Sequence, residues 1–204
     1  MPTAKNTVAY PKLKDLLARS VNFCLGVHRR PTQVWFARQY SFAMATALFI
    51  VDVQHAQFFG PWAMPDSAKL LSRIGNRLLL ARQDSTPVFH IQNDAPEGEL
   101  DAPGMPFWQL VFNPAAGERV IRKSSPNVFD DNPYLDAELR HLGISSIELA
   151  GVQSELCLRS CFLGAKSLGF DVNLDRSLHG SIDSDTQTHS EISDAVQLEL
   201  MGGN

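Results

Sequence analysis

The sequence predicts an α/β fold in which helices cover a mainly parallel, doubly wound sheet. Short apolar, β-rich segments alternate along the chain with amphipathic segments of about 10–15 residues, which is the pattern of successive βαβ units. A length of 204 residues with 44% hydrophobic residues is also typical of one globular domain with a sizeable core. These two observations set the fold class, and the elements below follow in chain order.

The first half of the chain contains two expected strands and one long helix. The continuous apolar run over residues 46–53 indicates a strand that is buried on both faces. Residues 67–83 form the expected helix, because leucine and isoleucine recur along one helical stripe. The second strand is expected within residues 86–94. The following residues 95–118 are rich in proline, glycine and aromatic residues and too long for a simple turn, so we predict a functional loop or lid.

The second half of the chain continues the alternation. A brief strand, RVIRK, ends at Lys123. Gly143 and Gly169 close two expected helices, since glycine readily adopts the left-handed conformation that ends many helices. The remaining elements are expected as a helix over 132–143, a strand over 146–152, a helix over 155–169, a strand over 170–175 and a final helix over 189–201.

The charge distribution separates a basic beginning from an acidic body. The formal net charge of −4 gives no electrostatic case for nucleic-acid binding, and no apolar run reaches the roughly 18 residues of a membrane span. Residues 1–43 are basic and contain one acidic residue, Asp15, so we predict a poorly ordered extension before a domain over residues 44–204. We expect a cytoplasmic protein; a mitochondrial location is the alternative, because transit peptides are also basic.

The cysteines argue against a disulfide framework and against a zinc site. Cys24, Cys157 and Cys161 are odd in number and form no CxxC pair, which favours a reducing compartment. Cys157 and Cys161 lie four residues apart in one expected helix, so a redox pair stays open. A small core residue is the simpler interpretation of Cys161.

Three chemically useful side chains follow three of the expected strands. Asp52 ends the first strand, Lys123 ends the third, and Cys157 begins the helix after the fourth. The carboxyl ends of parallel strands share one edge of a sheet, where ligands bind, so we expect these side chains to meet. Asp52 can accept the thiol proton, and the Lys123 ammonium and the helix N-terminus are expected to favour the thiolate. N–H groups near Gln153 can bind an oxyanion. A purely structural Asp–Lys pair and a cysteine that only packs are the alternatives.

Four segments carry a resemblance to a known family. LFIVDVQHAQF, VIRKSSPNVFDDNPYLDAELRHLGI, ELAGVQSELCLRSCFLGAKSLGFDV and LHGSID resemble the isochorismatase-like cysteine hydrolases. The family pattern has an Asp shortly before a Gln after the first strand, then a Lys followed by a Phe, then a Gly-Val turn before a Cys. The resemblance extends from about Ala45 to Asp183, with the motifs in the order of the family.

The resemblance implies a three-layer α/β/α sandwich with a Rossmann-like sheet and a catalytic triad of Asp52, Lys123 and Cys157. It also implies a cis peptide between Val152 and Gln153, which would direct the Gln153 N–H into an oxyanion hole. A small amide, or another small acyl or vinyl-ether compound, is the implied substrate, and a dimer or tetramer is the implied assembly. The Asp-x-His-x-His metal set of the nicotinamidases is missing, so we expect a metal-independent enzyme without a cofactor.

Side chains near these motifs are candidates for lining a substrate pocket. They are Gln54, His55, Phe58, Trp62, Trp108 and Phe129. For the aromatic residues, ordinary core packing explains the pattern equally well. A non-catalytic family member that serves as an oligomeric scaffold or interaction subunit is the alternative function.

Overall fold

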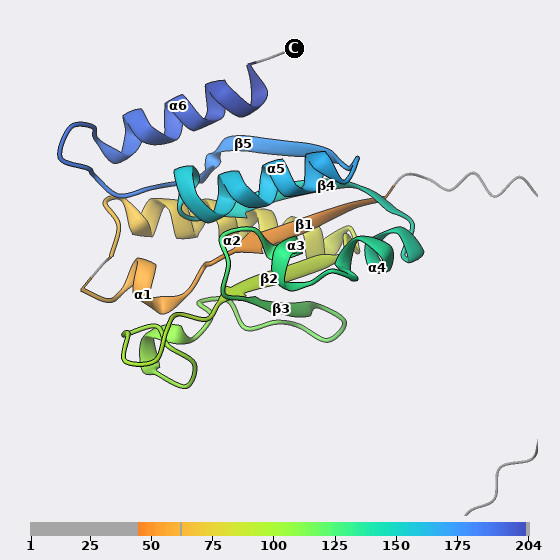
Figure 1. Cartoon of the computed structure of the whole chain (residues 1–204), viewed down its shortest axis with the longest axis horizontal. Coiled ribbons are helices and arrows are strands. Elements are labelled where there is room, and N and C mark those ends of the chain that lie inside the picture. The colour runs from red at the N-terminus through yellow and green to blue at the C-terminus, as the bar shows by residue number, and fades with distance from the viewer. Residues whose placement is uncertain (1–44, 62, 203–204) are drawn as a thin grey trace, which may run out of the picture. The chain divides into compact units, whose positions relative to one another are not determined.

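A computed structural model describes residues 45–61 and 63–202, and within them the chain forms a five-stranded parallel sheet (Figure 1). The strands are β1 (Ala45–Val51), β2 (Val88–Asn93), β3 (Arg119–Lys123), β4 (Ile144–Gly151) and β5 (Asp171–His179), in the order β3-β2-β1-β4-β5. The predicted parallel, doubly wound sheet is confirmed. The predicted extension over residues 1–43 and Trp62 lie outside the described residues.

Helices cover both faces of this sheet, as the three-layer prediction requires. One face carries α1 (His55–Phe58) and α2 (Ser67–Gln83), and the other carries α3 (Val128–Asp131), α4 (Leu135–His141) and α5 (Arg159–Ser167). In Figure 1, α5 lies in front of the sheet and α2 behind it. The π-helical turn η3 (Ser154–Leu158) precedes α5, and α6 (His189–Met201) packs against η3 and β5. A short 3-10 turn, η2 (Pro106–Trp108), lies in the long loop.

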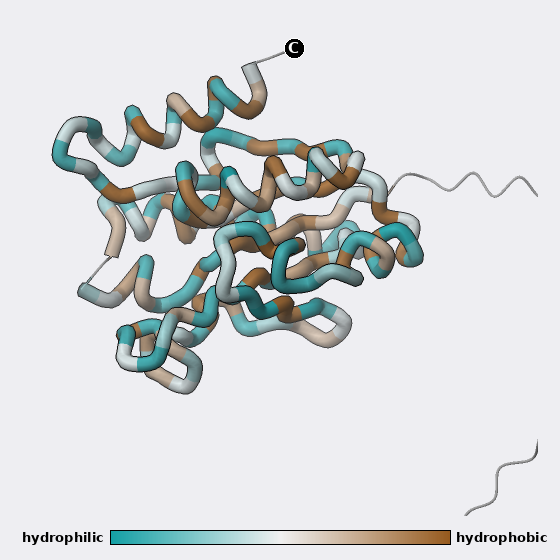
Figure 2. The backbone as a smooth tube through the Cα atoms, in the orientation of Figure 1, coloured by the Kyte–Doolittle hydropathy of each residue, from teal (hydrophilic) through white to brown (hydrophobic). Residues whose placement is uncertain are grey.

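The central strand β1 separates two hydrophobic cores. Phe49 and its same-face neighbours pack toward α3, α4 and α5, whereas Leu48 and Ile50 pack toward α2. All three side chains are essentially inaccessible, which explains the uninterrupted apolar run in the sequence. Figure 2 shows the most hydrophobic segments running through the middle of this layered arrangement. Burying each such side chain contributes about 1.5–3 kcal/mol, so β1 is a main source of stability.

Several element boundaries differ from the sequence-based predictions. The helix expected over 132–143 is shorter and corresponds to α4 alone, because Asn132 precedes Pro133 and has φ −128° and ψ 71°, outside the helical region. The short helix α3 before it was not predicted. The last strand continues to His179, and the helix expected from residue 155 begins as the π-helical turn η3. The short helix α1 was not predicted.

The strand order places a topological switch point between β1 and β4. From β1 the chain moves through β2 to β3, and it then crosses to β4 on the other side of β1. The two strands approach closely at their carboxyl ends, where Gly151 has φ +136° and an added Cβ would lie 2.0 Å from the carbonyl oxygen of Val51. Only glycine fits there. In open α/β sheets, ligands bind at this crevice.

Candidate active site

Asp52 occupies the switch point, directly after β1. Its backbone has φ +53°, in the left-handed region that Asp tolerates better than most residues. Its N–H donates to the carbonyl of Ile91 at 2.9 Å, which ties the turn to β2. The side chain is therefore held on a backbone conformation that the neighbouring strands impose.

Lys123 connects Asp52 to Cys157. Its Nζ donates to Asp52 Oδ2 at 3.1 Å, to Asn93 Oδ1 at 3.3 Å and to Cys157 Sγ at 3.3 Å. The Lys123 side chain is completely buried, and that of Asp52 is 9% exposed. The structure thus brings the three predicted side chains together around one buried ammonium.

The charges of this group determine where its proton resides. Burial raises the pKa of Asp52, although the Lys123 ammonium acts in the opposite direction. Burial and the Asp52 charge raise the pKa of the Cys157 thiol to about 12. Burial alone would lower the pKa of Lys123, but the charges of Asp52 and Cys157 raise it above its ordinary value. One ammonium balances one anion, so Asp52 and Cys157 share a single proton.

This arrangement corrects the expectation that Lys123 and the helix start would stabilise a resting thiolate. Burial and the Asp52 charge raise the pKa of the Cys157 thiol to about 12, which favours the thiol over a resting thiolate. The second carboxylate oxygen, Asp52 Oδ1, is buried and has no hydrogen-bond partner among the described residues. An unpartnered acceptor beside a protonated thiol is suited to removing that proton during a reaction.

A buried polar network holds the turn that carries Cys157 in place. Ser154 Oγ lies 2.7 Å from His179 Nδ1 and 3.0 Å from Ser193 Oγ, which ties η3 to β5 and α6. His179 Nε2 lies 3.0 Å from Gln197 Oε1, and burial lowers the pKa of His179, so the ring is neutral. Sequence reasoning missed this network, whose only signal was the LHGSID segment. The Val152–Gln153 peptide is cis.

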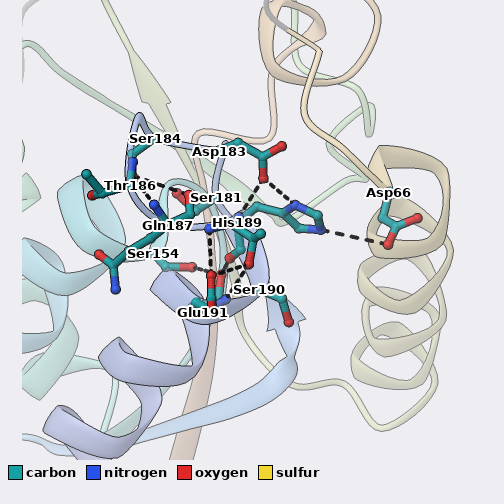
Figure 3. A network of polar contacts seen from close by, with 12 residues as sticks. Asp66, Ser154, Ser181, Asp183, Ser184, Thr186, Gln187, His189, Ser190 and Glu191 are labelled. Atoms are coloured by element: carbon teal, nitrogen blue, oxygen red, sulfur yellow. Dashed lines mark hydrogen bonds and ion pairs between the residues drawn. The ribbon is translucent and has the colours of Figure 1, made fainter.

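A second polar cluster lies where α6 begins. In Figure 3 the His189 ring lies between Asp183 and Asp66, with Ser154 and Ser181 nearby. This cluster borders a cavity of about 240 Å³ between α2, β5 and α6. No member of the Asp52–Lys123–Cys157 group lines that cavity, so it contains no nucleophile of the kind predicted.

The cavity that does include the thiol is smaller, about 110 Å³. Its lining consists of Asp52, Gln54, Gln57, Asn93, Asp101, Val152, Gln153, Leu156 and Cys157. Gln153 and Cys157 belong to the first turn of a helix, where backbone N–H groups lack intrahelical partners. A reacting carbonyl in this cavity would therefore meet a thiol, a carboxylate and free N–H groups.

Four predicted pocket residues lie outside this lining. Phe58 and Phe129 belong to the two hydrophobic cores instead, where Phe129 stacks between aromatic neighbours. The ring of His55 packs edge-on against Phe59, with centroids 5.3 Å apart. Trp108 lies in the long loop, and its Nε1 donates to Asp94 Oδ1 at 2.9 Å. The sequence pattern alone did not show whether these side chains face the hydrophobic core or the pocket.

The long loop over residues 95–118 reaches the cavity through backbone contacts to the sheet edge. Gln54 Nε2 donates to the carbonyls of Asn93 and Trp108, each at 3.0 Å, and Gln92 Nε2 donates to the Trp108 carbonyl at 2.9 Å. The loop thereby places Asp101 in the lining. Sequence reasoning identified the loop but not Asp101. It also missed Asn93, which the strand-end argument applied to β2 could have found.

Cys161 is a core residue. It is 1% exposed, and its Sγ donates to the Pro126 carbonyl at 3.5 Å. Burial raises the pKa of its thiol to about 12. Cys157 and Cys161 are both free thiols, which agrees with the packing interpretation of Cys161.

Within residues 45–61 and 63–202, no group of three or more His, Cys, Asp or Glu side chains is arranged to hold a metal ion. In the same part of the chain, every helix is too short or too polar to cross a membrane.

Comparisons with known proteins add a family match. A family model described as Isochorismatase domain matches residues 46–197. The streptothricin hydrolase of Streptomyces noursei is 36% identical to the chain over 156 residues, which make up 76% of this chain and 55% of that protein. The chain thus spans about half the length of this relative.

Two solved structures share the architecture. An isochorismatase from Pseudomonas putida KT2440 superposes with a TM-score of 0.71 at 23% identity, covering 78% of this chain and 84% of that one. The N-carbamoylsarcosine amidase from Thermoplasma acidophilum gives a TM-score of 0.67 at 20% identity, covering 78% and 94%. At these identities the likeness establishes the fold alone.

Proposed function

Because the chain belongs to the isochorismatase family, we propose that it is a cysteine hydrolase that cleaves a small amide with Asp52, Lys123 and Cys157. The observation that supports this most directly is the contact of one buried ammonium with both a carboxylate and a thiol, at 3.1 and 3.3 Å. The streptothricin hydrolase relative supports a hydrolytic reaction. A nucleophile, a base and free N–H groups around one cavity suit acyl transfer.

In the first half of the reaction, Cys157 Sγ attacks the substrate carbonyl carbon while Asp52 accepts the thiol proton. The N–H groups of Gln153 and Cys157 stabilise the negative charge that develops on the carbonyl oxygen. Lys123 stays an ammonium and balances the one anion present at each stage. The carbon–nitrogen bond then breaks as the Asp52 carboxyl returns its proton to the leaving amine, which leaves a thioester on Cys157.

In the second half, water hydrolyses the thioester. Asp52, again a carboxylate, accepts a proton as the water attacks the carbonyl carbon. The carbon–sulfur bond breaks, the acid product leaves, and the proton passes from Asp52 to the departing sulfur. The single shared proton of the resting site is thereby restored, so no external acid or base is needed.

A substrate screen, repeated with a variant that lacks the proposed nucleophile, tests the proposal. Purified protein is incubated with small primary amides and with streptothricin, and the release of ammonia or of a new carboxylic acid is measured. Replacement Cys157→Ala should abolish turnover, by at least about 10³-fold, and leave the melting temperature nearly unchanged. The matched control Cys161→Ala removes the other described thiol and should retain the catalytic activity.

Trapping of the thioester provides the second readout. Acid quench followed by peptide mass spectrometry should find the acyl group on the peptide that contains Cys157. If no amide is turned over and Cys157 is never acylated, the scaffold alternative is favoured. If Cys157→Ala retains activity, the nucleophile has been misassigned.

A further inference from the structure

Asp101 is a buried carboxylate that the catalytic mechanism does not use. The residue is 9% exposed and lines the same cavity as Cys157. Its carboxylate oxygens are not among the fully buried, unpartnered atoms of the described residues, so they keep contact with the cavity. A carboxylate in this position is available to a molecule bound beside Cys157.

The other groups of the lining leave the charge of Asp101 unbalanced. Among the described residues, the cavity lining includes no Lys, Arg or His, and the charge of Asp52 is already matched by Lys123. The charge of Asp101 acts to raise the pKa of Asp52, so it is felt at the catalytic group. The described lining therefore carries a negative charge beside the thiol that no cation of the same lining balances.

We propose that Asp101 is the specificity residue for substrates that carry a cationic ammonium group a short distance from the scissile amide. The amide part of this inference rests on the proposed function. The ammonium would pair with the Asp101 carboxylate, while the amide carbonyl lies against Cys157. A cavity of about 110 Å³ requires the two groups to be close together. Neutral and anionic amides of the same size would bind less well.

A charge series of one amide tests this directly. The probes are 3-aminopropanamide, butanamide and succinamate, which carry an ammonium, a methyl and a carboxylate group at the same position. Binding is measured by titration calorimetry with the Cys157→Ala protein, and kcat/KM is measured with the unmodified protein. The ammonium compound should bind at least about tenfold more tightly than butanamide, and succinamate should bind most weakly.

Asp101→Asn is the decisive variant. It should remove the preference for the ammonium compound, while the affinity for butanamide should change little. Glu97→Gln is the matched control, because it removes the same charge from an exposed position of the same loop and should leave the preference intact. A merely structural Asp101 would predict a lower melting temperature and an equal loss of affinity for all three compounds.

The outcomes separate the two proposals. Binding with the predicted preference but no turnover would overturn the amide hydrolysis and leave the subsite standing. Turnover without the preference, or a preference that survives Asp101→Asn, would overturn the subsite alone. Failure of 3-aminopropanamide to bind at millimolar concentration would also overturn it.

Discussion

At the scale of single residues, the site depends on a proton that Asp52 and Cys157 share beside Lys123. Both acids have raised pKa values because they are buried and close together, and one ammonium can balance only one of them. Lys123 therefore ensures that one anion is always present, without deciding which atom carries it. In the proposed reaction, proton transfer to Asp52 and attack by sulfur therefore belong to one step.

Replacement Asp52→Asn should separate thiol acidity from catalysis. Removing the carboxylate takes away a charge that raises the pKa of Cys157 and leaves Lys123 facing the sulfur alone, so the thiol pKa should fall below its present value of about 12. At pH 7 to 8 the variant should thus be alkylated by iodoacetamide faster than the unmodified protein. Turnover should nevertheless be nearly lost, because no group accepts and returns the proton.

The measurement is the pH dependence of alkylation at the Cys157 peptide, followed by mass spectrometry in a Cys161→Ala background. Slower or unchanged alkylation of Asp52→Asn would show that the carboxylate does not control the thiol.

At the scale of elements, Glu118 connects the end of the long loop to α2 and β2. Its carboxylate accepts from Arg82 Nε of α2 at 2.7 Å and lies 2.9 Å from His90 Nε2 of β2, and it also accepts from the Ala115 N–H at 2.8 Å. Burial lowers the pKa of His90, so the neutral ring donates. The Arg82 guanidinium holds the pKa of Glu118 at about 2. These contacts of Glu118 are remote from the cavity that contains Cys157, but they fix one end of the loop that carries Asp101.

Glu118→Gln should lower stability in a pH-dependent way. A carboxyl whose pKa is lowered by folding stabilises the protein above its unfolded pKa of about 4.5, and this contribution is lost as the pH falls toward 2. The shift corresponds to at most about 3 kcal/mol, and screening at the partly exposed Arg82 reduces it. Urea unfolding should therefore show a clear difference between the two proteins at pH 7 and a smaller one at pH 3.

His90 is present in both proteins, so the difference between them isolates Glu118. Glu97→Gln removes a charge from the same loop without removing a partner and serves as the control. An equal difference at both pH values would contradict the charge-based explanation.

At the scale of the whole molecule, every layer of the described fold is built from residues after Met44. The sheet begins with β1 at Ala45, and the family match begins at residue 46. The described residues build two hydrophobic cores and line the cavity that contains Cys157. The expected dimer or tetramer stays a prediction, which light scattering after size exclusion would measure.

Deletion of residues 1–43 should therefore leave a folded domain. We expect a chain that starts at Met44 to keep the melting temperature of the full chain within a few degrees and to keep its kcat/KM on the amide found by the screen. Calorimetry and the turnover assay check the two parts of this prediction. A fall of more than about 8 °C would correspond to a loss of 2 kcal/mol or more and would show that the deleted residues stabilise the fold.

The sequence by itself determined the fold class and the convergence of the triad. The bounds of α2 and α6 agree with the predicted ranges 67–83 and 189–201, because the periodicity of a helix is local in sequence. Asp52, Lys123 and Cys157 could be placed together because the carboxyl ends of parallel strands share one edge. No knowledge of side-chain packing was needed for that inference.

Only the tertiary structure decided which side chains face the cavity and where the proton resides. Asp101 enters the lining because Gln54 and Gln92 hold the loop by its Trp108 carbonyl, a contact between segments far apart in the chain. The pKa of the Cys157 thiol rises because surrounding layers exclude water from it and place a carboxylate beside it. Loop position and desolvation both depend on the sum of distant contacts, which periodicity and spacing along one chain do not encode.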